Sequence, residues 1–127
     1  MLSPSLEDYL EAIAVLSNEA EYVHASTIGQ YLSVKKSSVT VALRQLRYHK
    51  LIEYKPYKPI KLTLFGQKKA FEILQRHTAL REFFIHILHI EPDKANQAAC
   101  KIEHTIGPEI TNKLAEFVRD YKQERSL

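Results

Sequence analysis

The spacing of apolar residues changes from helical to alternating at Leu51 and returns to helical at Phe65. The segments 51–54 and 60–63 alternate apolar and polar side chains as short strands do, and they are joined by Lys55-Pro56-Tyr57-Lys58-Pro59. Two prolines make this joint a turn, because proline cannot donate to a strand ladder. The stretch therefore predicts one hairpin inside a chain whose remaining apolar spacing is helical.

Three short helices are predicted ahead of the hairpin. Ser3-Pro4-Ser5 is typical of a helix start, and the apolar face that follows it reaches about Ser17. A second helix is predicted over 26–32, and a third, capped by Ser37 or Ser38, runs towards Lys50. The order helix, helix, turn, helix, two-stranded ribbon is that of a winged helix-turn-helix, whose third helix enters the major groove of DNA.

Three further helices are predicted after the hairpin. The first is long and runs from Phe65 to about His89; the second, capped by Asp93, reaches about Thr105. Gly107-Pro108 then stops one helix and starts the last. We therefore predict a mainly α protein.

The charged residues are distributed unevenly. Residues 1–34 hold five acids and no Lys or Arg, whereas residues 35–69 hold ten of the 18 Lys and Arg residues with Glu53 as their one acid. The formal net charge of +3 hides this basic block, which covers the predicted third helix and the hairpin. On a lone helix such charge is more often a solvated face. Here the charge and the element order independently indicate DNA binding.

The first turn of the third helix is the part expected to approach bases and phosphates. Hydroxyl groups there can donate to phosphates or contact base edges, and a valine can touch thymine methyl groups. The predicted DNA contacts of the helix and hairpin are Lys36, Ser37, Ser38, Thr40, Val41, Arg44, Arg47, Tyr57 and Lys58.

Candidate metal ligands recur at one-turn spacing. Two acids share a face of the first helix, a histidine lies in the long helix, and three further donors share a face of the next helix. These residues are Asp8, Glu11, His77, Cys100, Glu103 and His104. Carboxylate, imidazole and thiolate groups together suit a divalent transition metal better than magnesium or calcium. Spacing alone leaves open that Asp8 and Glu11 are acids favoured by a helix dipole and that Glu103-His104 is an exposed charged pair.

Enzymatic and membrane functions have little support in the sequence. No P-loop, G-x-S-x-G, C-x-x-C or H-E-x-x-H motif occurs, and three glycines leave little material for phosphate-cradling loops. No apolar run approaches the ~20 residues of a membrane span. The single cysteine cannot form an internal disulfide, which favours a reducing, cytoplasmic compartment.

The chain resembles the metal-dependent repressors of the diphtheria toxin repressor and manganese transport regulator type, most closely the short manganese-regulator branch. The resemblance rests on segments throughout the chain: 3–11, 37–40, Leu62-Thr63 with Gly66, Arg76-His77 and 102–104. It implies an N-terminal winged helix-turn-helix with a two-stranded wing at 1–72. A helical dimerisation and metal-binding domain would follow at 73–127.

The resemblance also implies a set of metal ligands. Asp8, Glu11, His77, Glu103 and His104 match the two-metal site of the manganese type. Cys100 departs from it, because the manganese branch has Glu there and iron-type members have Cys. Arg81 and Asn96 stand where the iron-type pattern has a carboxylate and a histidine. The implied effector is Mn²⁺ or Fe²⁺, with up to two ions per subunit, and Zn²⁺ or Co²⁺ able to substitute.

The resulting hypothesis is a cytoplasmic, homodimeric repressor of manganese or iron uptake genes that binds a palindromic double-stranded operator and no membrane. Metal would tie the first helix to the dimer core and set the spacing of the two recognition helices. The alternative is a metal-independent winged-helix protein whose helical half binds a protein partner. A small hydrolytic metalloenzyme is disfavoured, because nothing resembles a substrate pocket.

Overall fold

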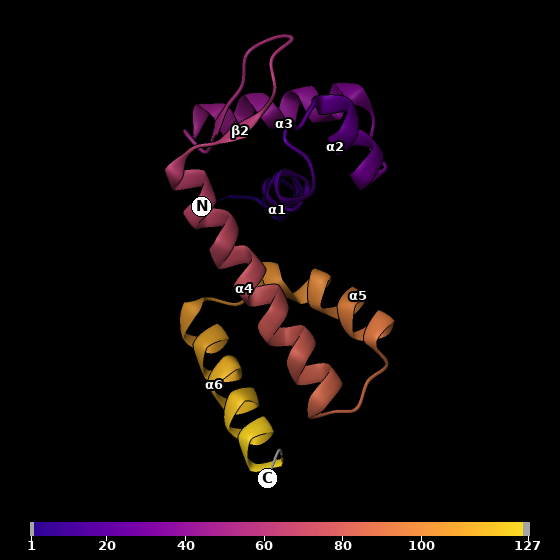
Figure 1. The fold of residues 1–127 in the computed structure, drawn as a ribbon, viewed down its shortest axis with the longest axis vertical. Helices are drawn as coiled ribbons and strands as arrows, with labels where there is room; N and C mark the ends of the chain where they lie inside the picture. The colour runs from indigo at the N-terminus through magenta and orange to yellow at the C-terminus, as the bar shows by residue number, and fades with distance from the viewer. Residues whose placement is uncertain (1, 126–127) are drawn as a thin grey trace. The chain divides into compact units, whose positions relative to one another are not determined.

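The computed structural model describes residues 2–125, most of which are helical (Figure 1). The elements run in the order α1 (Pro4–Glu19), α2 (Ala25–Leu32), α3 (Lys36–Tyr48), β1 (Ile52–Glu53), β2 (Lys61–Leu62), α4 (Leu64–His86), α5 (Pro92–Ile102), the 3-10 turn η1 (Glu103–Thr105) and α6 (Pro108–Arg125). The chain divides into two compact units, Met1–Phe71 and Glu72–Leu127, with the boundary inside α4. Within the described range, no helix combines the length and hydropathy of a membrane span.

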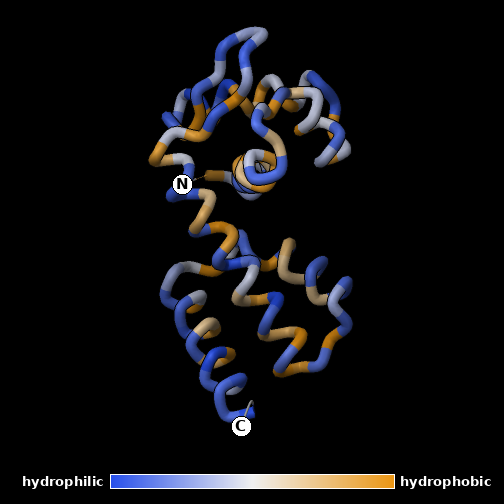
Figure 2. The backbone as a smooth tube through the Cα atoms, viewed as in Figure 1, coloured by the Kyte–Doolittle hydropathy of each residue, from blue (hydrophilic) through white to orange (hydrophobic). Residues whose placement is uncertain are grey.

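The first three helices form the core of the first unit. Their apolar side chains recur every three or four residues, so that each helix turns one face inward. The fully buried members include Leu10, Ile13, Ile28, Val39, Leu43 and Leu46. Figure 2 shows hydrophobic residues gathered on α1. Burial of each large side chain contributes about 2 kcal/mol, which makes this core the main source of stability for the unit.

The wing, residues 52–62, is the predicted hairpin with shorter strands. β1 and β2 pair antiparallel, with Ile52 opposite Leu62 and Glu53 opposite Lys61. Ile60 instead forms a bridge with Val23, donating its N–H to the Val23 carbonyl at 2.8 Å. That N–H is therefore unavailable to β1, which explains why the second strand begins one residue later than predicted. The loop between the strands extends away from the helices (Figure 1).

Thr63 and Gly66 fix the start of α4 beside the end of α3. The Thr63 hydroxyl donates to the Lys50 carbonyl at 2.7 Å and accepts the Gly66 N–H at 3.0 Å. A Cβ added to Gly66 would overlap the Leu51 carbonyl, so only glycine permits this approach of backbone to backbone. The residues that follow the wing, Thr63 and Gly66, are thereby held against those that precede it, Lys50 and Leu51.

Several predicted helix ends differ from the structure, among them α1, which reaches Glu19, and α5, which gives way to a 3-10 turn at Glu103. α3 begins at Lys36 after an extended Lys35 with no side-chain cap, so that Ser37 and Ser38 lie inside the first turn and are not caps. Asp93 also lies inside a first turn, since α5 begins at Pro92. α4 ends at His86, because the N–H of Leu88 bonds back to the Phe83 carbonyl and the chain then leaves the helical path.

The second unit packs the later part of α4 with α5, η1 and α6. Its buried apolar residues are Ile73, Ala79, Leu80, Ala95, Ala99 and Val118. The rings of Phe83 and Phe117 lie 6.1 Å apart between α4 and α6. This unit is the helical half that the sequence predicts.

Candidate metal centre and nucleic-acid interface

α1 carries the two candidate ligands of the first unit. The helix starts as predicted, because the Ser3 side chain accepts the N–H of Leu6 at 3.2 Å. Asp8 is exposed and Glu11 is half-buried. Since they are three positions apart, both carboxylates project from neighbouring positions on one face of α1.

The second unit holds the other four candidate ligands, and His77 on α4 contacts two of them. Nδ1 of His77 lies 2.8 Å from Oε2 of Glu103 and 3.7 Å from Sγ of Cys100. Nε2 of the same ring lies 2.7 Å from Oδ1 of Asn96. The two ring nitrogens therefore face different groups, one a pair of anionic ligand types and the other a neutral amide.

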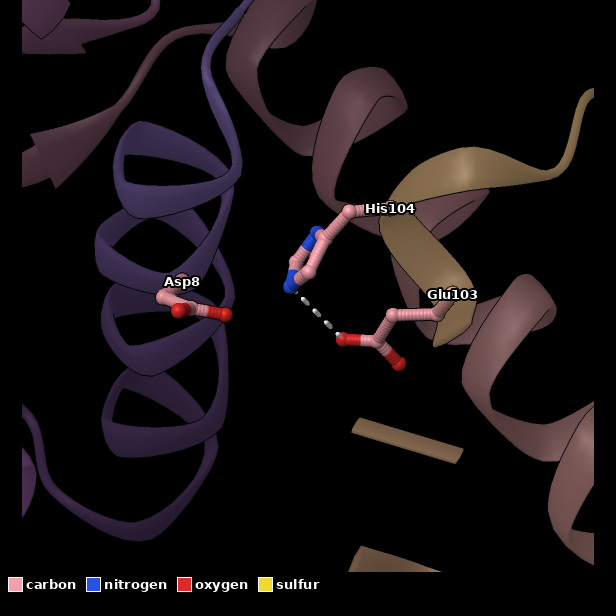
Figure 3. A group of neighbouring side chains, drawn as sticks. All are labelled: Asp8, Glu103 and His104. Atoms are coloured by element: carbon pink, nitrogen blue, oxygen red, sulfur yellow. Dashed lines mark ion pairs between the residues drawn. The ribbon is translucent and has the colours of Figure 1, made fainter. Parts of the chain in front are cut away.

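Glu103 lies at the junction where α5 passes into η1. The guanidinium of Arg76 donates to the backbone carbonyl of Glu103 at 3.1 Å, which holds this junction against α4. The Glu103 side chain is only 1% exposed, and its second oxygen, Oε1, lies 3.7 Å from Nε2 of His104. Figure 3 shows this ion pair, together with Asp8 on α1. Each oxygen of the buried carboxylate thus faces an imidazole.

This donor set fits a divalent transition metal. A buried carboxylate is costly unless positive charge or hydrogen bonds compensate it. Imidazole, carboxylate and thiolate are together the ligands of first-row ions such as iron, zinc and cobalt, and the carboxylate also suits manganese. In this unit His77, Glu103 and His104 belong to groups of side chains that could hold a metal ion, and the Cys100 thiol lies beside His77.

Two residues around the cluster are not among the predicted site residues. Asn96 precedes Cys100 by four residues and shares its face of α5, so helical spacing could have identified it. Arg76 enters the sequence prediction only as part of a family segment. Its bond to the Glu103 carbonyl depends on the packing of α4 against η1, which no sequence spacing reveals.

The predicted DNA contacts lie on α3 and the wing and are mostly exposed. Lys36, Ser37, Ser38, Val41 and Arg44 extend from the outer face of α3. Thr40 is half-buried, and its hydroxyl donates to the Lys36 carbonyl at 3.1 Å. On the wing, Tyr57 and Lys58 are exposed. The structure therefore presents hydroxyl, methyl and cationic groups together on one helix.

Arg47 differs from its neighbours because it is engaged within the unit. Its guanidinium donates to the Tyr54 carbonyl at 3.1 Å and lies 5.7 Å from the centre of the Tyr54 ring. A groove of about 530 Å³ opens here between α3 and the wing. Its lining holds four cationic side chains and one acid: Tyr22, Arg47, Glu53, Tyr54, Lys55, Lys58, Pro59 and Lys61. Such a surface is suited to a polyanion.

Tyr57 occupies the tip of the wing in a left-handed conformation. Its φ is 62°, and the Lys58 N–H bonds to the Lys55 carbonyl at 3.1 Å across the turn. Positive φ after a proline is the geometry of a type II turn, where glycine or asparagine is preferred. The aromatic ring is fully exposed, so no packing within the unit compensates this choice of residue.

Family models match both halves of the chain. The model described as "Iron dependent repressor, N-terminal DNA binding domain" matches residues 1–60. The model described as "Iron dependent repressor, metal binding and dimerisation domain" matches residues 63–125. An uncharacterized HTH-type transcriptional regulator of Methanocaldococcus jannaschii is 32% identical over 124 residues, which cover 97% of this chain and 99% of that protein.

Solved structures of similar fold agree with these matches. The manganese regulator SloR superposes with a TM-score of 0.80 at 25% identity, over 93% of this chain and 55% of that one. IdeR of T. acidophilum gives 0.77 at 26% identity, over 87% and 52%. The present chain thus spans about half the length of these two structures. The matches confirm the predicted fold class, a winged helix-turn-helix followed by a helical domain.

Proposed function

The chain belongs to the family of iron-dependent repressors, DNA-binding transcriptional regulators rather than enzymes, and we propose that it is a metal-activated homodimer that represses manganese or iron uptake genes. Its operator is a palindromic double-stranded DNA, and its compartment is the cytoplasm. The observation that carries the metal dependence is the buried Glu103 carboxylate between two imidazoles, with a thiol beside one of them.

The ligands proposed for the effector come from both units. Asp8 and Glu11 of α1 join the cluster of the second unit, His77, Cys100, Glu103 and His104. A bound Mn²⁺ or Fe²⁺, in one or two copies per subunit, brings positive charge to these acidic groups. Without that charge the carboxylates repel one another, and α1 is free to shift against the dimerisation half.

The DNA-facing residues then depend on where α1 is held. α1 packs with α3 in one core, so that the contacts on α3 move with it. The proposed contacts are Lys36, Ser37, Ser38, Thr40, Val41, Arg44, Arg47, Tyr57 and Lys58. A fixed α1 sets the spacing of two α3 helices to that of two successive major grooves. Only the DNA-competent arrangement needs to bind the effector better for the population to shift.

The competing function is a metal-independent winged-helix protein that uses its helical half to bind a protein partner. In the second unit, Ile102, Ile110 and Phe117 are apolar and exposed, which suits such a partner. A second copy of the chain would cover apolar surface equally well, and the matched domain is described as a dimerisation domain. Metal activation accounts for the cluster of candidate ligands, whereas binding of a protein partner does not. We therefore prefer the metal-activated repressor.

The test is metal-dependent DNA binding by the purified full chain. A duplex is first selected from random-sequence DNA with Mn²⁺ present, and its affinity is then measured with EDTA, Mn²⁺, Zn²⁺ and, anaerobically, Fe²⁺. We expect a metal to raise the affinity roughly 5- to 150-fold, the usual size of allosteric coupling. Glu103→Gln should remove this increase. The exposed Glu109 provides the matched control, Glu109→Gln.

Two results would contradict the proposal. An affinity that is the same with EDTA and with every metal would favour the metal-independent alternative. A metal response that survives Glu103→Gln undiminished would leave metal activation standing but place its site elsewhere.

A further inference from the structure

The two nitrogens of the His77 ring face opposite sides of the cluster. Nδ1 lies 2.8 Å from Oε2 of Glu103 and 3.7 Å from Sγ of Cys100, whereas Nε2 lies 2.7 Å from Oδ1 of Asn96. Nδ1 is therefore the atom that points to the other candidate ligands. Nε2 points away from them, to a side chain that is not a ligand type for this site.

Coordination through Nδ1 determines what Nε2 must do. A neutral imidazole carries one hydrogen, so when the Nδ1 lone pair binds a cation the hydrogen is on Nε2. Oδ1 of Asn96, at 2.7 Å, is then the acceptor of that hydrogen. We propose that Asn96 is a positioning residue that fixes the tautomer and orientation of His77 for metal binding through Nδ1, an inference that rests on the proposed function.

The position of Asn96 in the fold suits this role. It lies on α5 between Ala95 and Ala99, which are fully buried, so its backbone is fixed against the core of the unit. Cys100 follows one turn later on the same face. One helix therefore supplies both a candidate ligand and the hydrogen-bond partner of another. Their separation is set by helix geometry, not by flexible loops.

An amide at this position has one property that a carboxylate lacks. It offers both an acceptor oxygen and donor N–H groups, so it can also hold Nε2 when the hydrogen is on Nδ1 and donates to Glu103. The ring therefore keeps its place in either tautomer, while the Asn96 amide turns to present its oxygen to a protonated Nε2 or its N–H group to an unprotonated one.

Metal titration of the full chain tests the proposal. Mn²⁺ binding is measured from the electron paramagnetic resonance signal of the free ion, and Co²⁺ binding from visible absorption. We expect Asn96→Ala to weaken binding of each ion 10- to 100-fold, the usual effect of losing such a partner. Asn96→Asp retains the acceptor and should restore binding. Gln97→Ala, an exposed neighbour on α5, is the matched control and should match the wild type.

The tautomer of His77 gives a second measurement. It would not change if Asn96 served only to stabilise the fold. In the zinc-loaded protein, nitrogen-15 spectra should show the His77 hydrogen on Nε2 and exchanging slowly, and Asn96→Ala should make it exchange faster. Melting temperatures identify any variant that fails to fold. If Asn96→Ala does not fold, metal binding is compared between Asn96→Asp and Asn96→Ser instead.

Two outcomes overturn the inference, and they are distinguishable from failure of the proposed function. If the wild type binds metal and Asn96→Ala binds it equally well, Asn96 does not position the ligand. Zinc bound with the His77 hydrogen on Nδ1 would equally exclude the proposed role. If the wild type binds neither Mn²⁺ nor Co²⁺, the proposed function fails and the inference fails with it.

Discussion

In the second unit the candidate ligands contact one another and the backbone, whereas in the first unit most candidate DNA contacts extend into solvent. His77 has partners within 2.8 Å on both ring nitrogens, and the Glu103 carboxylate is 1% exposed. On α3, by contrast, Lys36 and Arg44 are exposed. The candidate metal ligands are thus in contact with one another, whereas most side chains proposed to contact DNA remain exposed to solvent.

This difference follows from what each ligand requires. A metal ion accepts donors only within a few tenths of an ångström of fixed distances, so scattered side chains would lose much of the binding energy to ordering. Phosphate contacts act through charge over several ångströms and tolerate flexible side chains. The side-chain contacts among candidate ligands therefore lie in the second unit, and those of the first unit lie in its core and at the base of the wing.

Gly66→Ala should have the largest effect on stability, and it should affect the first unit but not the second. The new Cβ would overlap the Leu51 carbonyl at the base of the wing, and relieving that overlap costs about 3 kcal/mol of unfolding free energy. We expect DNA affinity to fall at least tenfold. Cobalt absorption from the Cys100 thiolate should remain, because that ligand belongs to the other unit.

Gly107→Ala is the control for this variant, since an added Cβ there meets nothing within 4 Å. Urea unfolding followed by circular dichroism measures the change in each. Equal stability of the two variants would show that the backbone at Leu51 yields easily, and would remove the argument that the wing has a rigid base.

Arg47→Ala and Arg44→Ala should differ in how they change the salt dependence of DNA binding. Arg44 is exposed, so its loss should remove one phosphate contact and lower the slope of log affinity against log salt by about 0.9. Arg47 already bonds to the Tyr54 carbonyl. Its loss should lower the slope less than the loss of Arg44 does, because part of its guanidinium is engaged within the unit, and it should also loosen the wing, which faster hydrogen exchange at Lys58 would report. Equal slope changes would show that the bond to Tyr54 does not limit the contact of Arg47 with phosphate.

The order of elements could be predicted because it depends on local patterns. Apolar spacing, the prolines of the wing and Gly107-Pro108 predict every helix and the hairpin. Helix starts were less predictable: at Ser37 and Asp93 a residue that favours caps lies inside the first turn. The backbone becomes helical one or more residues earlier there, and a proline at the first position of α5 favours this.

The partners of the candidate ligands could not be predicted in the same way. One-turn spacing placed Cys100, Glu103 and His104 on a common face, although the helix changes to a 3-10 turn at Glu103. The spacing of Asn96 from Cys100 could indicate its face of α5 but not its bond to His77, and Arg76 became visible only through its contact with Glu103. Such contacts depend on how helices pack, which a single sequence does not encode locally.

Tyr57→Gly should change the free energy of unfolding least, and it should increase it. Glycine adopts a φ of 62° without the cost of about 1 kcal/mol that a side chain incurs there, although it also makes the unfolded chain more flexible. We expect a net gain of a few tenths of a kcal/mol in urea unfolding. DNA affinity should fall roughly fivefold, because the exposed ring is lost as a contact.

A gain in stability with a loss of affinity would mean that the tyrosine is kept at the tip for binding, at the expense of the turn. Tyr57→Asn separates the two effects, since asparagine also tolerates positive φ but presents a small polar side chain. Tyr57→Phe retains the ring and should bind nearly as the wild type does. If all three variants bind DNA equally, the wing tip lies off the duplex, and the contacts of the first unit are confined to α3 and the groove beside it.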